Sequence, residues 1–413
     1  MSNTCCTPTH AGLLGYEEAL ERLLAGARPV SGVEQVPLRE ALGRVLALPL
    51  ISAIDVPGWD YSAMDGYVVR AADVVQPGTR LPVSQRIPAG TTGRPLAPGT
   101  AARIFTGAPI PDGADAVVMQ EVCAAEGDAV TVQVAVTAGD NVRRRGEDIA
   151  AGAEVVAAGT RLQPQHLGLA ASVGMAELTV FRRLRVALFA SGDELVMPGN
   201  PLRPGSIYNS NLFTATALLQ GLGCEVLDLG TVADTLEATM AALTHGAERA
   251  DLILASGGVS VGEEDHVKPA VERLGRLDLW RIAIRPGKPV AFGYVGDTPF
   301  LGTPGNPVSM FVTFLLFARP FLLKRMGVAN HRPQPLQVTA DFDWPRPDPR
   351  REFHRARLSR DARGRVTAQV HPSRSSAVLS SVTWADGLVV LPEGRQVKVG
   401  DTLEFLSFAE LMR

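Results

Sequence analysis

Residues 254–270 read LASGGVSVGEEDHVKPA, and this stretch decides the fold because an apolar run passes through Ser-Gly-Gly into a highly polar loop. The run DLILA, residues 251–255, leads into the stretch and has the composition of a buried strand, and residues 266–274 after the loop have helical length and pattern. A strand, a glycine-rich loop and a helix in direct succession are typical of an α/β domain. The loop also carries three successive carboxylates, residues 263–265, with Lys268 beyond them, so it is too polar to be only a connection.

The same alternation continues through residues 184–330. Three further apolar runs of strand length, LRVALFAS, CEVLDLG and PVAFGYV, accompany segments of helical pattern at residues 209–221, 235–249 and 307–326. Near-continuous apolar strands that alternate with helices predict a doubly wound α/β domain. We assign it to residues 184–330.

The segments on either side of this domain have different patterns of apolar and turn-forming residues. GYEEALERLLAG, within residues 11–48, and QPQHLGLAASVGM, within residues 156–183, have helical periodicity, so these two segments are expected to meet in a helical stalk. Residues 49–155 consist of short β-type runs separated by Gly, Pro and Asp, which predicts a β-rich insertion that projects from the stalk. Residues 331–413 follow the linker HRPQPL and contain short β runs, which predicts a small C-terminal barrel or sandwich. The chain is therefore expected to be a multidomain α/β and all-β protein.

Composition and charge exclude several classes of protein. The 413 residues are 46% hydrophobic and 20% charged, which is typical of a soluble protein of roughly two to four domains. A net charge of -3 gives no electrostatic footprint for nucleic acid or for an anionic membrane surface, so neither is expected as a partner. The longest apolar run, residues 311–318, is too short to span a bilayer and predicts a buried helix. No basic segment followed by an apolar run marks the N-terminus for secretion, so a cytoplasmic location is expected.

The cysteines give no evidence of a metal centre or of disulfides. Cys5, Cys6, Cys123 and Cys224 have neither metal-ligand spacing nor a disulfide framework. Cys5 and Cys6 are expected to be tail residues, although adjacent thiols could also bind a metal or oxidise. The sequence leaves their role open.

Polar and glycine residues follow the predicted strands at the points where the strands end. In an open parallel sheet the ligand binds beyond the carboxyl ends of the strands, so these loops are the candidates for a binding site. Glycine lets backbone N–H groups approach a phosphate closely, and the helix that starts near Asn306 offers further N–H donors. Carboxylates that converge on one cleft repel each other unless a cation neutralises them, so Glu194, Asp234 and Asp265 together predict a Mg²⁺ site. The other candidates in these loops are Ser191, Gly192, Gly257, Gly258 and Pro304.

Basic residues that could balance these acids lie close together in DLWRIAIRPGKPVAFG. They are Arg281, Arg285 and Lys288, and Lys268 is expected to lie nearby. Arg281 and Arg285 are an even number of residues apart, so within one strand they would share a face and could clamp an anion. The predicted site therefore suits a divalent metal, an oxyanion and a phosphate ester, with catalysis by positioning and charge neutralisation.

Each of these motifs also has a purely structural explanation. SGG can be a tight turn, SGDE can cap a helix, GTPGNPVS can be a turn into a helix, and basic strand residues often lie on a solvated edge. The motifs nevertheless all follow successive strands of one domain. That co-occurrence favours a functional site.

The β-rich insertion has its own candidates. Asp65 lies in an Asp-Gly pair that is typical of a hairpin turn, and Thr106 and Asp148 also lie in turn-like segments. The run of three arginines at residues 143–145 is typical of a solvated patch, although it could meet an anionic ligand. Local sequence alone therefore favours turns at these positions.

Taken together, the motifs resemble those of a known family. SAMDGYVV, IFTGAPIPDGADAVVMQE, RRRGEDI, SGDELV, IYNSN, SGGVSVGEEDHVK, IRPGKPVAFG and GTPGNPVS, in this order and spacing, resemble the molybdopterin molybdenumtransferase family, known as MoeA in bacteria and as the E domain of gephyrin. The resemblance spans the chain from about residue 14. It implies an elongated homodimer of four-part subunits. It also implies insertion of molybdenum from molybdate into adenylylated molybdopterin with Mg²⁺-dependent release of AMP, the final step of molybdenum cofactor biosynthesis.

The resemblance also implies roles for individual residues. Glu194, Asp234 and Asp265 match family acids at the metal and nucleotide site, and Arg281 and Arg285 match basic residues held to contact molybdate or the pterin. Some members carry Lys at positions 281 and 285, so here a planar fork replaces a point charge. The remaining matches are Lys288 of the PGKP motif, Asp65, Thr106 and Asp148, which in the family face the α/β site of the other subunit, and Arg355 and Ser376 in the C-terminal part.

Two alternative functions stay open. The α/β domain is also similar to that of molybdopterin adenylyltransferases, but the full β-rich insertion, the C-terminal part and the retained Asp65 and Thr106 argue against that activity. A non-catalytic molybdopterin-binding scaffold is the second alternative, because fold does not fix function. The transferase would have transient contacts with the preceding adenylyltransferase and with recipient molybdoenzymes.

Overall fold

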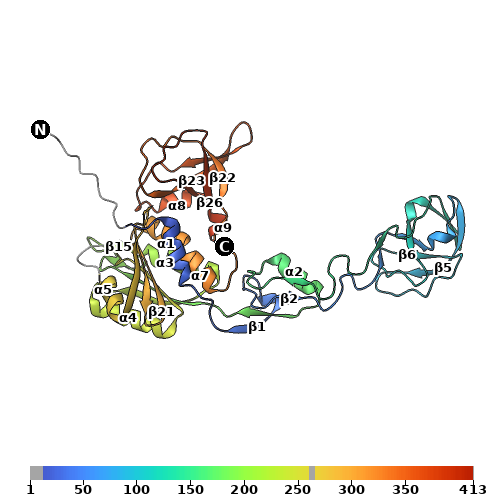
Figure 1. The fold of residues 1–413 in the computed structure, drawn as a ribbon, viewed down its shortest axis with the longest axis horizontal. Coiled ribbons are helices and arrows are strands. Elements are labelled where there is room, and N and C mark those ends of the chain that lie inside the picture. The colour runs from blue at the N-terminus through green and yellow to red at the C-terminus, as the bar shows by residue number, and fades with distance from the viewer. Residues whose placement is uncertain (1–12, 260–265, 413) are drawn as a thin grey trace.

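The computed structural model describes residues 13–259 and 266–412, which form an elongated molecule (Figure 1). A compact body at one end contains the α/β domain and a C-terminal β-barrel. A narrow stalk leads from this body to a small β-rich lobe at the opposite end. We call residues 61–143, which make up that lobe, the distal lobe.

The α/β domain is built on a six-stranded sheet with the order β16-β13-β17-β21-β20-β18. The first four of these strands run parallel, and β20 and β18 are each antiparallel to the preceding neighbour. The strands are β13 (Arg185–Ser191), β16 (Glu225–Val232), β17 (Leu252–Ser256), β18 (Gly275–Arg281), β20 (Pro289–Val295) and β21 (Thr298–Thr303). The helices are α3 (Ser210–Leu222), α4 (Leu236–Arg249), α5 (Val267–Leu274), α6 (Pro307–Thr313) and α7 (Arg319–Arg325), with a π-helical turn at Phe314–Ala318 between the last two.

Both faces of this sheet are covered, which explains its continuous apolar strands. Along β13, Val186 and Leu188 pack with α3, α6 and α7, whereas Ala187 and Phe189 point to the opposite face and pack with α4 and α5. Burial of a side chain such as Phe189, which is 0% exposed, contributes roughly 1.5–3 kcal/mol. The predicted doubly wound domain is therefore confirmed.

One helical stretch of the described residues, Pro307–Arg325, is long and apolar enough to cross a membrane. Its most apolar window is 89% buried inside the protein. It is the core helix of the α/β domain, in agreement with the buried helix predicted from the apolar run at residues 311–318.

The first helix does not join the stalk, so that expectation was wrong. Helix α1 (Tyr16–Ala25) packs against α7, and the ring of Tyr16 contacts those of Phe317 and Phe353 at centroid distances of 5.5 and 5.1 Å. The physical reason is area: α1 buries five side chains and needs a large apolar partner, whereas α2 (Pro164–Ser172) buries only Ala170. The stalk consists of α2 and two short antiparallel pairs, β1 (Val33–Pro37) with β12 (Glu177–Phe181) and β2 (Leu50–Ile51) with β11 (Glu154–Val156).

The distal lobe is all-β, as predicted for the insertion. Its six-stranded sheet has the order β7-β4-β6-β5-β9-β8. The strands are β4 (Gly66–Val69), β5 (Thr79–Ile87), β6 (Ala101–Ile104), β7 (Ala116–Met119), β8 (Cys123–Glu126) and β9 (Ala129–Val132), and β3 (Tyr61–Ser62) pairs with β10 (Val142–Arg143) beside them.

The C-terminal sheet is a closed barrel, because β23 pairs with β25 as well as with β24. Its strands are β22 (Leu336–Ala340), β23 (Arg351–Arg360), β24 (Val366–Val370), β25 (Gly387–Leu391) and β26 (Thr402–Ser407), with short helices α8 (Ser380–Trp384) and α9 (Phe408–Leu411). A sixth strand, β19 (Ile284–Arg285), comes from the α/β domain and pairs with β23.

The expectation that Arg281 and Arg285 share one strand face is therefore wrong. Arg281 ends β18, whereas Arg285 lies in β19. Between them Ile282 bridges Leu14, and Ala283 donates its N–H to the Leu14 carbonyl oxygen, so the chain turns toward the barrel.

Candidate active site

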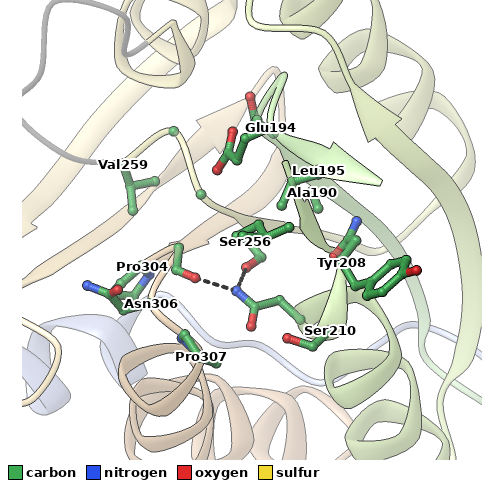
Figure 2. A pocket seen from close by; sticks show the side chains of 18 of the residues that line it. Ala190, Glu194, Leu195, Tyr208, Ser210, Ser256, Val259, Pro304, Asn306 and Pro307 are labelled. Carbon is green, nitrogen blue, oxygen red and sulfur yellow. Dashed lines mark hydrogen bonds between the residues drawn. The ribbon is translucent and has the colours of Figure 1, made fainter. Parts of the chain in front are cut away.

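A cavity of about 760 Å³ opens at the carboxyl ends of β13, β17 and β21 (Figure 2). This is the edge of the sheet where the sequence predicted a ligand site. The predicted residues that line the cavity are Ser191, Gly192, Glu194, Asp234, Gly257, Gly258, Pro304 and Asn306. The structure therefore brings the loops after three parallel strands together with the loop after β16.

Asp234, in the loop after β16, is held by hydrogen bonds to both of its carboxylate oxygens. The Ser191 hydroxyl donates to Oδ1 at 2.6 Å, and the backbone N–H of Asp193 donates to Oδ2 at 3.2 Å. In return, the N–H of Asp234 donates to the Asp193 carboxylate at 3.1 Å. The carboxylate thus has a defined orientation and still has lone pairs for a further ligand.

Glu194 lines the same cavity but has a different environment. Across the described chain, its carboxylate has no hydrogen-bond or ion-pair partner, and Figure 2 shows it among the residues that surround the cavity. Mg²⁺ is commonly held through one or two carboxylates plus substrate phosphates. Glu194 and Asp234 fit such a cation, although no group of three His, Cys, Asp or Glu side chains that could hold a metal occurs within residues 13–259 and 266–412.

The predicted third acid, Asp265, lies outside the described residues, as do Cys5 and Cys6. Its proximity to Glu194 and Asp234 stays a prediction.

Gly257 is required where β17 ends because the backbone is crowded there. Its φ is +90°, and a Cβ atom would lie 2.5 Å from the Ser191 carbonyl oxygen. Its N–H also donates to the Thr303 carbonyl oxygen at 3.0 Å, which ties β17 to the end of β21. A side chain at this position would push these loops apart.

Asn211 connects these loops, and the sequence reasoning missed it. Its amide nitrogen donates to the Ser256 hydroxyl at 2.9 Å and to the Gly305 carbonyl oxygen at 2.7 Å. A carbonyl oxygen can only accept, so this contact fixes the orientation of the amide. The signal in the sequence was the segment IYNSN, where Asn209 caps α3 by accepting from the Leu212 N–H at 3.1 Å. Other lining residues that were not predicted include Leu195, Ile207, Tyr208, Asn209, Ser210, Ala377 and Leu379.

The predicted basic residues do not line the cavity. Arg281, Lys268 and Lys288 are exposed, and Lys268 lies 4.0 Å from Glu272. Arg285 is held by the barrel: its guanidinium lies 3.0 Å from the Asp348 carboxylate and 3.6 Å from that of Glu352. Arg285 thus links the α/β domain to the barrel.

Arg355 also does not line the cavity; it lies on β23, buried beneath α8 and the loop before it, where it is 1% exposed. Its guanidinium donates to the Ser381 hydroxyl at 2.9 Å and to the carbonyl oxygens of Ser373 and Ser375 at 2.7 and 3.2 Å. Burial lowers the pKa of this guanidinium. The carbonyl oxygen of Ser376 accepts the N–H of Val308 at 3.0 Å, so the loop that Arg355 holds is attached to the start of α6.

The distal lobe contains Asp65 and Thr106, far from the cavity of the same chain (Figure 1). The Asp65 carboxylate accepts from both the N–H and the hydroxyl of Thr106 at 2.8 Å, and these bonds lower its pKa. Asp148 is exposed where the lobe meets the stalk.

The three arginines beside Asp148 are paired rather than free. Arg143 lies 2.9 Å from Glu147, Arg144 lies 2.6 Å from Asp60, and Arg145 lies 2.5 Å from Asp55. Two of these pairs therefore tie together the two chain segments that connect the lobe with the stalk, which favours the structural interpretation over an open anion site.

Comparisons with known proteins agree with this architecture. The chain matches the MoeA N-terminal region (domain I and II) over residues 14–174, a probable molybdopterin binding domain over 187–324 and the MoeA C-terminal region (domain IV) over 337–408. It is 38% identical over 404 residues to the molybdopterin molybdenumtransferase of Haemophilus influenzae, covering 97% of this chain and 100% of that protein. It is also 38% identical over 406 residues to molybdopterin molybdenumtransferase 2 of Mycobacterium tuberculosis, covering 94% and 98% of the two chains. A solved molybdopterin biosynthesis MoeA protein from Pyrococcus horikoshii superposes with a TM-score of 0.85 at 29% identity, covering 96% of this chain and 100% of the other.

Proposed function

Because the chain belongs to the MoeA family, we propose that it is a molybdopterin molybdenumtransferase, which inserts molybdenum from molybdate into adenylylated molybdopterin and releases AMP. The observation that carries this proposal is the cavity, where glycine-rich loops meet Asp234 and Glu194 at the carboxyl ends of parallel strands. Loops of this kind present backbone N–H groups to phosphates, as an adenylylated substrate requires.

The residues of the cavity have separate tasks in this proposal. Glu194 and Asp234 would hold Mg²⁺, which when bound would neutralise phosphate charge and orient the phosphoanhydride. The Ser191 hydroxyl keeps the Asp234 carboxylate in one orientation through its 2.6 Å hydrogen bond. Asn211 keeps the loops after β17 and β21 at a fixed separation through its two amide hydrogen bonds. The chain thus contributes mainly binding and positioning.

We also propose a homodimer in which the distal lobe of one subunit completes the cavity of the other. Within a single chain, Asp65 and Thr106 lie at the opposite end of the molecule from Glu194 and Asp234 (Figure 1). Large apolar side chains are also exposed along and beside the stalk, which is typical of a surface that another protein covers. They include Val33, Leu48, Ile51, Ile54 and Trp59, which are 47–60% exposed.

Compartment and further partners belong to the same proposal. The thiols of Cys123 and Cys224 are unpaired, which suits a reducing compartment, and we place the reaction in the cytoplasm. Delivery of substrate by an adenylyltransferase and transfer of product to molybdoenzymes would occur through transient contacts.

The test is AMP release from adenylylated molybdopterin by the purified full chain, with and without Mg²⁺ and molybdate, together with a molybdenum assay of the pterin product. We expect release that depends on both ions, and a loss of about 100-fold or more in Glu194→Gln. Glu248→Gln, the same change at an exposed carboxylate of α4 outside the cavity, is the matched control and should retain activity within a few fold. Tight pterin binding without turnover would instead support a scaffold.

The shared site is tested by mixing two inactive variants, Asp65→Ala and Asp234→Ala. Heterodimers would contain one intact composite site, so partial activity should return after subunit exchange. Exchange confirmed by mass spectrometry without any recovery would show that the site lies within one chain.

A further inference from the structure

Arg103, in β6, donates hydrogen bonds to Gly66 and Gln120, two residues that adjoin Asp65. Its Nη1 donates to the carbonyl oxygen of Gly66 at 2.8 Å, and its Nη2 donates to the side-chain oxygen of Gln120 at 2.6 Å. Gly66 follows Asp65 in the chain, and the N–H of Gln120 donates to the Asp65 carbonyl oxygen at 3.1 Å. One guanidinium therefore holds Gly66 directly and, through Gln120, the residue that binds the backbone carbonyl of this acid.

The same guanidinium also contacts the segment that carries Thr106. Its central carbon lies 4.6 Å from the ring centroid of Phe105 and 5.3 Å from that of Tyr67, distances that suit cation–π contacts. Phe105 directly precedes Thr106, whose N–H and hydroxyl both bind the Asp65 carboxylate. Arg103 thus links β4 and β6 where the two functional side chains meet.

Backbone packing leaves little freedom for this arrangement to shift. A Cβ atom on Gly66 would lie 1.9 Å from the Val118 carbonyl oxygen, so β4 is pressed against β7 immediately after Asp65. Because β4 is fixed against β7 and pairs with β6 on its other edge, we infer that the position of Thr106 relative to Asp65 is set by β6, which Arg103 ties to Gly66 of β4.

We propose that Arg103 is a positioning residue for the transferase reaction, holding the Asp65 carboxylate and the Thr106 hydroxyl in the relative geometry that the substrate meets. It acts through these two groups without touching the substrate. The planar fork of Arg is needed because it donates along two directions while its face stacks on aromatic rings, which Lys does not reproduce. This inference rests on the proposed function for its catalytic consequence, but the positioning itself can be measured separately.

The experiment compares Arg103→Met and Arg103→Lys with Arg86→Met. Arg86 is a matched control because its guanidinium stacks on the same ring, 4.5 Å from the centroid of Phe105, is exposed and lies on the neighbouring strand. Two quantities are measured in the full chain: hydrogen exchange of the Thr106 amide, and kcat and KM for AMP release. Exchange needs no substrate, so it remains informative if the proposed function fails.

We expect exchange at Thr106 to become about fivefold or more faster in both Arg103 variants, as for the loss of one net hydrogen bond. We expect kcat to fall about tenfold or more with a small change in KM, because the misplaced groups act on the reaction rather than on binding. Arg86→Met should change neither quantity. If Arg103→Met does not fold, Gln120→Leu removes the acceptor of Nη2 and should give a weaker effect in the same direction.

Two results would overturn the inference. Unchanged Thr106 exchange in Arg103→Met would show that the guanidinium does not hold the pair, and a fully active Arg103→Lys would show that charge alone suffices. Absence of activity in the unaltered protein, with faster exchange in the variants, would refute the proposed function while supporting the positioning role. Faster exchange with unchanged kcat in an active protein would refute the catalytic consequence.

Discussion

Substitution of Arg355 by Met tests whether this residue acts through a loop or through direct contact with substrate. The guanidinium is 1% exposed and binds Ser381, Ser373 and Ser375. The loop that it holds continues into Ala377 and Leu379, which line the cavity. We therefore expect the Met variant to loosen the barrel-side wall of the cavity and to leave the carboxylate side intact.

The expected loss of global stability is small because opposing terms nearly cancel. Three hydrogen bonds to a cation contribute about 1.5–3 kcal/mol each, but burial of a cation that has no carboxylate partner among residues 13–259 and 266–412 costs several kcal/mol. Ser375 is exposed and Ser373 half-buried, so their carbonyl oxygens can bind water after the substitution, and the Ser381 hydroxyl still donates to Val378 at 2.6 Å. We expect a net destabilisation of about 1–2 kcal/mol.

The local effect should be much larger than the global one. Released from the guanidinium, residues 373–379 should exchange their amide hydrogens faster, as measured by mass spectrometry. A wall displaced by about 1 Å can reduce kcat/KM by about 100-fold. Ser381→Ala, which removes one of the three hydrogen bonds, is the control and should have an intermediate effect on both quantities.

Normal exchange at residues 373–379 together with a large loss of kcat/KM in Arg355→Met would refute this reasoning. It would mean that Arg355 contacts the substrate after a rearrangement that exposes it.

Two further perturbations follow from the same structure. Arg350, with a smaller contribution from Arg285, holds the pKa of Asp348 well below its usual range. The ionised Asp348 carboxylate therefore stabilises the folded protein fully above the unfolded-state pKa of about 4. This stabilisation is lost as the pH falls through the lower folded-state pKa. Asp348→Asn should therefore flatten the loss of thermal stability between about pH 4 and pH 2, and an unchanged slope would exclude this link. Gly257→Ala should cost about 1–3 kcal/mol in unfolding free energy because of its positive φ and the 2.5 Å contact with Ser191. Gly305→Ala, whose Cβ would be 3.7 Å from its nearest neighbour, is the control, and equal melting temperatures for the two variants would contradict the crowding argument.

The sequence predicted the α/β domain well because its strands are buried on both faces. Such strands are continuously apolar, and the loops after them must meet at one edge of the sheet. This rule alone, without any measured distance, predicted that one cavity would be lined by Ser191, Asp234, Gly257 and Asn306.

Contacts between distant segments were not predictable in the same way. Asn211 contacts Gly305, 94 residues later, and Arg285 pairs with Asp348, 63 residues later. Each position looked like an ordinary helix start or basic strand residue in the sequence. Similarly, the three arginines at residues 143–145 resembled a free patch because two of their carboxylate partners, Asp55 and Asp60, lie more than 80 residues earlier.

The charge of the residues that line the cavity bears on both the proposed Mg²⁺ site and the proposed homodimer. No Lys, Arg or His is among the described residues that line it, whereas Glu194 and Asp234 are. An anionic substrate would be repelled by such a site, so binding needs backbone N–H groups and a cation. If Mg²⁺ supplies most of that neutralisation, withdrawal of Mg²⁺ should weaken nucleotide binding, whereas Asp65→Ala should lower turnover with little change in affinity. If Asp65→Ala and Mg²⁺ withdrawal instead weakened binding equally and without additivity, the distal lobe would have to contribute to the cation site itself.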